Sequence, residues 1–275
     1  MTRRLIRMTA LVAIAGLALS ACGDDKSDSS SGSTTTAEAG GSEAGALVVC
    51  SDIPYEPMEF EATKEKTPSG YTGFDIDLAQ EFATKANKTL EVKVTPFDGI
   101  FAAMDAGNCN AVISSVTITD ERKQNMDFSE PYFDSNQSLM VLKANADTYK
   151  TLADLEGKNI GVQSGTTGEE YTKKNTPAGA TVTALPGSAD LFAALEAGSI
   201  DAIVQDYPIN AYRAKQNTNV VITEKIKTNE QYGMAVKKGN TETLTLLNDG
   251  LATAKSDGTY DTLYEKYFGE KPPTS

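Results

Sequence analysis

FAAMDAGNCNAVISS, at residues 101–115, returns further along the chain as FAALEAGSIDAIVQD at residues 192–206. Each copy has the apolar pattern of the end of an amphipathic helix, followed by a glycine, Gly107 or Gly198, that favours a helix stop. A short run of alanine and β-branched residues comes next, which is typical of a buried strand. Because a helix followed by a buried strand is the repeating unit of a parallel sheet, the two copies predict an α/β fold.

The duplication also predicts where a ligand would bind. A further strand precedes each copy, at residues 47–50 and 159–162, so we expect two α/β lobes. Ligands of open α/β sheets bind beyond the carboxyl ends of the strands, and the alignment places Ser115 and Asp206 at equivalent ends. A duplication that only built two cores would need no polar residue there. Since both ends are polar, we expect the lobes to face a shared cleft.

The N-terminal segment, residues 1–21, has the order of a secretory signal, with three arginines, a short apolar run and small residues. Cleavage just before Cys22 is typical of bacterial lipoproteins, whose terminal cysteine sulfur carries a diacylglyceryl group. An ordinary signal with an incidental cysteine is the alternative. Residues 22–46 would then be the lipidated cysteine and a flexible linker, too poor in apolar side chains to fold. We expect an extracytoplasmic protein, anchored to the bacterial cell membrane by lipidated Cys22.

The composition excludes several classes of function. The chain has 25 Lys and Arg against 38 Asp and Glu, a formal charge of −13, which would repel the phosphates of nucleic acids. It has no histidine, which removes the commonest metal ligand and the usual general base. We therefore expect no nucleic-acid partner, no metal site, no cofactor and no histidine-based catalysis.

Cys50 and Cys109 are the cysteines that remain besides Cys22. An oxidising compartment favours their pairing, which predicts a disulfide within one lobe. Strand geometry leaves the alternative of two unpaired thiols open. Cys50 lies late in its strand and Cys109 precedes the next one, so a parallel register would place their Cα atoms beyond the roughly 7 Å limit.

The body of the chain, residues 47–269, resembles the extracellular solute-binding proteins of family 3, the polar amino-acid-binding proteins of ABC importers. The motifs that carry the resemblance are SSVTITDERKQNMDFSEPY at 114–132, YTGFDIDLA at 71–79, IGVQSGTTGEE at 160–170, IVQD at 203–206 and DGTYDTLYEKYFG at 257–269. The resemblance implies a type II periplasmic-binding-protein fold, in which a two-strand hinge joins two α/β lobes around the ligand cleft. It places lobe 1 at residues 47–139 plus 233–272 and lobe 2 at residues 140–232.

The resemblance also implies a function. Such a protein is a monomeric, lipid-anchored receptor without enzymatic activity, which closes its lobes on an amino acid and delivers it to the membrane permease of an ABC transporter. An amino acid in a cleft needs a cation for its carboxylate and a carboxylate for its ammonium group.

By the resemblance, Arg122, Thr117 and Thr167 hold the ligand α-carboxylate, and a planar guanidinium suits that group. A surface pair between Arg122 and Asp120 is the alternative that spacing alone allows. Thr167 ends a stretch, residues 164–167, that lies between a strand and a helix start, where free backbone N–H groups favour an anion. A phosphate loop is the rival interpretation of this stretch, but the lysine and spacing of that motif are missing.

The resemblance assigns the ligand ammonium group to Asp206, with the carbonyl or hydroxyl of Ser115 beside it. A helix N-cap is the alternative role for Asp206, and the two roles are compatible. Tyr55 and Phe97 match the two aromatic residues that sandwich the stem of the ligand side chain. Core packing is the commoner fate of such residues and is their alternative.

Asp52 matches the position that meets the far end of a lysine, arginine or glutamine side chain. A cationic or amide group would relieve the burial cost of this acid, so arginine and lysine are favoured, glutamine comes next and acidic ligands are not expected. Gln163 and Gln205 depart from the pattern of glutamine-selective members and leave the exact ligand open. Glu56 and Glu59 lie in a loop where charged side chains are usually solvated.

Two other classes of function compete with the binding protein. An enzyme of the same fold, similar to cyclohexadienyl dehydratases, would need a positioned acid, for which Glu56 or Glu59 is the nearby candidate. A receptor ectodomain would need a membrane-spanning segment after the body, and residues 270–275 supply none. The polar residues expected in the cleft are already explained by a binding site for a zwitterion.

Overall fold

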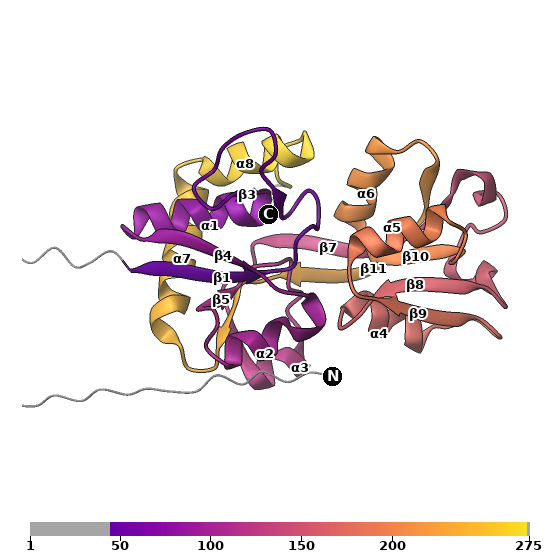
Figure 1. The fold of residues 1–275 in the computed structure, drawn as a ribbon, viewed down its shortest axis with the longest axis horizontal. Coiled ribbons are helices and arrows are strands. Elements are labelled where there is room, and N and C mark those ends of the chain that lie inside the picture. Colours follow the sequence, from indigo (N-terminus) through magenta and orange to yellow (C-terminus); the bar gives the residue numbers. More distant parts are fainter. Residues whose placement is uncertain (1–44, 274–275) are drawn as a thin grey trace, which may run out of the picture. The chain divides into compact units, whose positions relative to one another are not determined.

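The computed structural model describes residues 45–273, in which the strands form two five-stranded sheets and one two-stranded ribbon (Figure 1). The predicted signal, the lipidated Cys22 and the linker up to residue 44 lie outside the described residues. Within residues 45–273 no helix is both long and apolar enough to span a membrane.

The first sheet and the helices packed on it form what we call the first lobe. Its elements are β1 (Ala46–Ser51), β4 (Thr89–Val94), β5 (Ala111–Val112), β6 (Met126–Phe128), β12 (Ala235–Lys237), α1 (Phe74–Lys85), α2 (Ile100–Asp105), α7 (Thr241–Ser256) and α8 (Thr259–Phe268). The strand order is β4-β1-β5-β12-β6, with β1 parallel to β4 and β5. Side chains alternate along β1, so Leu47 and Val49 join the core under α1, α7 and α8, whereas Cys50 faces α2.

The second sheet and its helices form the second lobe. Its elements are β7 (Phe133–Leu142), β8 (Asn159–Gln163), β9 (Thr181–Leu185), β10 (Ala202–Asp206), β11 (Val220–Tyr232), α4 (Thr167–Lys174), α5 (Ser188–Glu196) and α6 (Tyr207–Gln216). The strand order is β11-β7-β10-β8-β9, with β8 parallel to β9 and β10. The strands have buried side chains on both faces, as Ile203 packs with α5 and Val204 joins the opposite core.

Several short elements complete the described chain. They are the ribbon strands β2 (Phe60–Glu61) and β3 (Tyr71–Thr72), the helix α3 (Asp120–Asn125) and the 3₁₀ helices η1 (Phe97–Gly99), η2 (Lys143–Asn145) and η3 (Leu152–Leu155). Both η1 and α3 lie in segments that lead away from first-lobe strands, which is where the sequence predicts ligand-binding residues.

Two long strands, β7 and β11, connect the lobes. They pair from Leu142↔Val220 at one end to Phe133↔Tyr232 at the other. Strand β6 of the first sheet precedes β7 in the chain, and strand β12 of the first sheet follows β11. This arrangement is the expected two-strand hinge and confirms the type II fold with two α/β lobes. The predicted lobe boundary between residues 139 and 140 lies inside β7, and the boundary after residue 232 lies at the end of β11. Both boundaries stay predictions.

The duplicated stretch folds as the sequence predicts. The first copy begins inside α2 and continues into β5, and the second begins inside α5 and continues into β10. The glycine after each helix has a left-handed backbone, with φ of 82° at Gly107 and 72° at Gly198. Glycine adopts this conformation without a steric cost, which explains why both helices end there.

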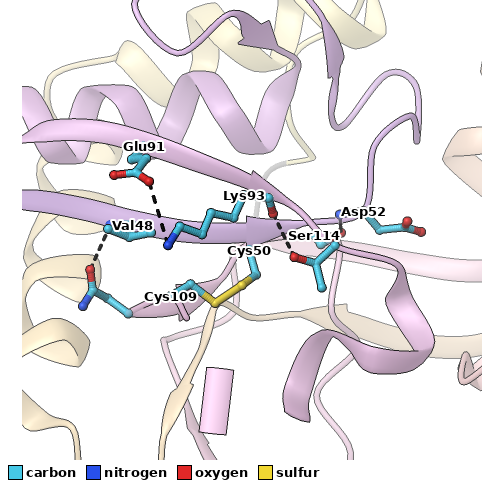
Figure 2. Close-up of a disulfide and its surroundings, with 9 residues drawn as sticks. Val48, Cys50, Asp52, Glu91, Lys93, Cys109 and Ser114 are labelled. Atoms are coloured by element: carbon cyan, nitrogen blue, oxygen red, sulfur yellow. Dashed lines mark hydrogen bonds and ion pairs between the residues drawn. A yellow bond between two sulfur atoms is a disulfide. The ribbon is translucent and has the colours of Figure 1, made fainter. Parts of the chain in front are cut away.

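Cys50 and Cys109 form a disulfide, with their Cα atoms 5.7 Å apart (Figure 2). The register that would separate them is not realised, because Cys109 lies in the turn after α2 and not on an extension of β5. The next residue, Asn110, already lies beside β1, since its backbone N–H donates to the Val48 carbonyl at 2.7 Å. The disulfide therefore ties the start of β5 to the end of β1, just before the predicted binding residue Asp52.

We predict that Gly250→Ala destabilises the first lobe. A Cβ atom on Gly250 of α7 would lie 2.6 Å from the ring of Phe82 on α1, which is 1% exposed. Such overpacking costs about 1–3 kcal/mol, measurable as a lower free energy of unfolding in urea. Gly99→Ala is the control, because nothing lies within 4 Å of the added Cβ. Equal stability of Gly250→Ala and the wild type would contradict this description of the α1–α7 packing.

Candidate functional site

The two predicted strand ends open on one cavity, with walls from both lobes. Its lining residues are Asp52, Tyr55, Phe97, Ser114, Ser115, Thr117, Arg122, Gln163, Thr166, Thr167 and Asp206. The structure therefore brings together all eight residues that the sequence predicts for ligand binding. It adds three that the sequence reasoning did not assign, namely Ser114, Gln163 and Thr166.

Arg122 lies in α3, where the Thr119 side chain caps the helix by accepting from the Arg122 backbone N–H at 3.1 Å. Its guanidinium donates to the carbonyls of Thr117 at 2.8 Å and, across the lobes, of Gly165 at 3.1 Å. It also lies over the ring of Phe97, 5.6 Å from the centroid. Burial lowers the pKa of Arg122, while nearby carboxylates oppose that shift. None of the ion pairs among residues 45–273 joins Arg122 to Asp120, so the surface-pair alternative is wrong.

Asp206 is the last residue of β10 and is 8% exposed. Its carboxylate accepts hydrogen bonds from the hydroxyls of Tyr55 at 2.9 Å and Tyr232 at 2.7 Å, and from the amide of Gln137. Burial, reinforced by the neighbouring Glu230, raises its pKa to about 6. Asp206 also occupies the N-cap position of α6, but its side chain makes no capping bond. The carboxylate is directed toward the cavity side of the sheet.

Glu230 is a functional candidate that the sequence did not reveal. It lies in β11, at the end of an irregular stretch of the pairing with β7, and is 9% exposed. Its Oε2 atom accepts from the hydroxyls of Thr117 at 2.7 Å and Thr167 at 2.8 Å, and its Oε1 atom accepts from Gln137 at 3.0 Å. The two threonines come from different lobes, so Glu230 joins them at the hinge.

Asp52 follows β1 and lines the cavity. Its backbone N–H donates to the Ser114 hydroxyl at 2.9 Å (Figure 2), and its carboxylate accepts from the Gln163 amide of the second lobe. Burial raises the pKa of Asp52 to about 6; the Gln163 hydrogen bond opposes this shift, and the carboxylates of Asp98 and Asp190 add to it. Gln163 thus has a defined partner, which the sequence left open.

The two predicted aromatic residues both line the cavity, and they differ in role. Phe97 begins η1, is 7% exposed and packs its ring against Phe101. Tyr55 is 8% exposed and also supplies a hydroxyl to Asp206, so it links the lobes by a hydrogen bond. Ser115 lines the cavity in a left-handed conformation with φ of 49°, which is uncommon for a residue with a side chain.

Three residues whose roles the sequence left open do not line the cavity. Glu56 is exposed, as expected for a loop. Glu59 is 0% exposed, so the expectation of a solvated side chain is wrong for it. The loop folds back on itself, with the Tyr55 N–H donating to the Glu59 carbonyl at 2.7 Å, which carries Glu59 into the lobe. Gln205 is buried and precedes Asp206 in β10, so alternation turns it away from Asp206.

The lining of the cavity carries charges of both signs. Arg122 is the one cation among the described lining residues, whereas Asp52 after β1 and Asp206 at the end of β10 are acids from different lobes. Within residues 45–273 no three acidic, cysteine or histidine side chains are grouped so as to hold a metal ion. The arrangement suits an organic ligand with one anionic and two cationic or donor groups.

The sequence model of the bacterial extracellular solute-binding proteins, family 3, matches residues 47–185 and 180–270. These ranges contain every residue of the cavity. The chain belongs to this family. Curated relatives of the chain include an L-cystine-binding protein and an ABC transporter glutamine-binding protein.

Relatives of this family-3 protein cover most of the chain. The L-cystine-binding protein TcyJ of Escherichia coli (strain K12) is 36% identical over 228 residues, 82% of this chain and 84% of TcyJ. An ancestral arginine-binding protein bound to arginine is 41% identical, with a TM-score of 0.75 over 82% of this chain and 98% of its own. A structure of an ancestral arginine-binding protein bound to glutamine has the same identity and coverage, with a TM-score of 0.76. The ancestral amino acid-binding protein AncCDT-1, a precursor of cyclohexadienyl dehydratase, is 40% identical with a TM-score of 0.74. The match covers 81% of this chain and 95% of AncCDT-1.

We predict that Gly165→Ala opposes the close contact of the lobes in this family-3 protein. Gly165 has φ of +77°, and a Cβ atom there would lie 3.2 Å from the Asp98 Cα of the other lobe. The variant should shift the population toward separated lobes, seen as a larger radius of gyration in small-angle X-ray scattering. Gly239→Ala has the same backbone strain, with φ of +81°, but no atom within 4 Å of the Cβ, and is the matched control. Identical scattering of the two variants would contradict the prediction.

Proposed function

We propose that this chain is the substrate-binding lipoprotein of an ABC amino-acid importer, and that its lobes close on a cationic amino acid. Arginine and lysine are the preferred ligands and glutamine is next. The observation that carries the proposal is the set of charges that line the cavity, with one cation, Arg122, and two buried acids, Asp52 from the first lobe and Asp206 from the second.

The α-carboxylate of the ligand fits beside Arg122. The guanidinium donates to two backbone carbonyls, so its position is fixed from both lobes. The hydroxyls of Thr117 and Thr167 each carry one proton, and both protons are donated to Glu230. The ligand carboxylate would be held by Arg122 and by backbone N–H groups in the first turn of α4, and Thr117 and Thr167 would join them by turning their hydroxyls from Glu230 to the ligand.

The α-ammonium group fits at Asp206. Burial and the nearby Glu230 raise the pKa of the Asp206 carboxyl, so a cation placed there would relieve an unfavourable environment. Three protein donors hold the carboxylate oxygens in place, which leaves its orientation fixed before the ligand arrives.

The ligand side chain would run between Tyr55 and Phe97 and end at Asp52. A guanidinium or ammonium group there would replace or join the Gln163 amide, and it would offset the negative charge of Asp98 and Asp190. The neutral amide of glutamine could donate a hydrogen bond to Asp52 but would leave the negative charge of Asp52 without a cation. Glutamine is therefore the second choice of ligand, after arginine and lysine. A carboxylate side chain would meet three acids and is disfavoured.

The membrane attachment and the partner follow from the same proposal. Lipidated Cys22 would anchor the receptor outside the cytoplasm, and the permease of an ABC transporter would accept the amino acid from the closed monomer. The solute-binding family supports an extracellular location. The alternative enzyme has less support, because Glu59 does not line the cavity and AncCDT-1 is itself an amino acid-binding protein.

A thermal-shift panel of the common amino acids tests the proposal. At about 100 times its dissociation constant the true ligand should add roughly 2.7 kcal/mol to the free energy of unfolding. We expect the largest increases in melting temperature with arginine or lysine, then glutamine. Arg122→Ala should abolish the shift, because the buried ligand carboxylate would lose the one cation among the described lining residues. Arg213→Ala, which removes an arginine bonded to Glu196 outside the cavity, should retain it. A flat panel would refute amino-acid binding.

Asp52→Asn should change the ligand preference. Loss of a charged hydrogen-bond acceptor should weaken arginine binding by about 1.5–3 kcal/mol in isothermal titration calorimetry, with glutamine affected less. Asp105→Asn makes the same substitution at an exposed position of α2 and should leave both affinities unchanged. Equal weakening of arginine and glutamine by Asp52→Asn would show that the far end of the cavity does not select for charge.

A further inference from the structure

Two acidic side chains, Glu59 and Asp75, are fully buried in the first lobe behind the cavity, each 0% exposed. Neither lines the cavity, and neither takes part in an ion pair among the described residues. Buried acids without cations are costly, so their retention calls for a physical explanation. Their hydrogen bonds lead directly to the loops that carry the ligand-binding residues.

Asp75 fixes the strained residue of the cavity. Its Oδ2 atom accepts from the Ser115 backbone N–H at 2.7 Å, and both of its oxygens lie 2.8 Å from the Tyr132 hydroxyl. Ser115 has φ of 49°, a conformation that costs energy in a residue with a side chain and persists only where its surroundings enforce it. The Asp75 carboxylate supplies that enforcement through the Ser115 N–H.

Glu59 fixes the two other loops of the first lobe that contribute to the cavity. Its Oε1 atom accepts from the Ser114 hydroxyl at 2.7 Å, and the Ser114 oxygen in turn accepts from the Asp52 backbone N–H at 2.9 Å. Its backbone pairs with Tyr55 in both directions, at 2.7 and 3.2 Å. The second carboxyl oxygen, Oε2, has no donor among the described residues. That oxygen is the natural place for a proton.

A single proton resolves the conflict between the two acids. If both were ionised, two negative charges would face each other in the interior of the lobe. Burial raises the pKa of Glu59 well above its usual value, and the Asp75 charge adds to that shift. A hydrogen bond from Glu59 in turn favours the ionised form of Asp75. The other titratable groups that act on the pair are Asp52, Tyr55, Tyr132 and Tyr260, and none is a cation. Ser114 and Ser115 donate hydrogen bonds to it.

We propose that Glu59 is held as a neutral carboxylic acid that donates its Oε2 proton to ionised Asp75, and that this pair positions the Asp52, Tyr55 and Ser115 loops for ligand binding. The second half rests on the proposed function. Glu59 and Asp75 are positioning residues, since neither lines the cavity.

The pair also makes ligand binding sensitive to a rise in pH. The shared proton is present below the raised pKa of Glu59, and it is lost as the pH rises through that pKa. Ionisation of Glu59 would then place its negative charge near that of Asp75, and the repulsion would weaken the hydrogen bond between Asp75 and the Ser115 N–H.

Three variants separate the hydrogen-bonding role from mere packing. Glu59→Gln keeps a donor toward Asp75 and an acceptor for Ser114, and it should bind arginine within about twofold of the wild type without the extra loss as the pH rises. Glu59→Leu fills similar space without these bonds and should weaken binding about tenfold or more, since it leaves buried partners unsatisfied. Glu61→Gln, at an exposed position of strand β2, is the control for loss of one charge and should match the wild type at every pH.

Infrared spectroscopy of the protein without ligand tests the protonation itself. At pH 8 the wild type should show the C=O stretch of a buried carboxylic acid, which Glu59→Gln removes and Glu61→Gln retains. Amide hydrogen exchange at Ser115 should be slow in the wild type and in Glu59→Gln and at least tenfold faster in Glu59→Leu.

These two readouts need no ligand, so they distinguish failure of this inference from failure of the proposed function. Absence of the acid band at pH 8 would overturn the shared proton. Equal Ser115 exchange in Glu59→Leu and Glu59→Gln would overturn the positioning role. If Glu59→Leu does not fold, Ser114→Ala takes its place in the binding assay, and wild-type affinity in that variant would refute the link to Asp52.

Discussion

Acids buried at the ends of strands, surrounded by hydroxyls and amides in place of cations, are the constraint on which the rest of the site depends. Asp206 is bonded by two tyrosines and a glutamine, and Asp52 by one glutamine, yet burial raises the pKa of each carboxyl to about 6. Neutral donors fix the oxygens in place but do not cancel their charge. A ligand with cationic groups at both ends completes what the protein leaves uncompensated, and Arg122 supplies the counterpart for its carboxylate.

The topology explains why these groups meet. β1 and β5 end in the first lobe and β8 and β10 end in the second, and both sets of carboxyl ends open on one cavity. The hinge strands add Gln137 from β7 and Glu230 from β11, which join residues of both lobes. A ligand that contacts both lobes gains interactions that separated lobes cannot offer, so it shifts the population toward closure. The carboxyl pair of Glu59 and Asp75 stabilises the first-lobe half of this arrangement before closure.

Much of this site could be predicted from the sequence, for identifiable reasons. The duplicated stretch predicts the strand ends at Ser115 and Asp206, and the family motifs bring Arg122 and Asp52 to the same cavity. Glu230 could not be found in this way. Its contacts depend on the register of β7 with β11 and on side chains from both lobes, which no local pattern encodes.

Local rules failed where the chain turns unexpectedly. Cys109 lies in a turn and not on a strand, so its Cα atom is 5.7 Å from the Cα atom of Cys50. Glu59 lies in a loop of ordinary polar composition, and only the return of that loop onto the first lobe buries it. In both cases the outcome depends on tertiary contacts that residue type and spacing do not specify.

Proton release on binding is the most direct test of the central claim that ligand cations compensate buried acids. The measurement is calorimetric titration with arginine near pH 6, in two buffers of different ionisation enthalpy. Asp52 and Asp206 are each close to half protonated at this pH, and a bound cation should ionise them, so we predict a release of about one proton per ligand. The release should vanish by pH 8, where both groups are already ionised. Binding at pH 6 with no proton release, or with proton uptake, would contradict the account.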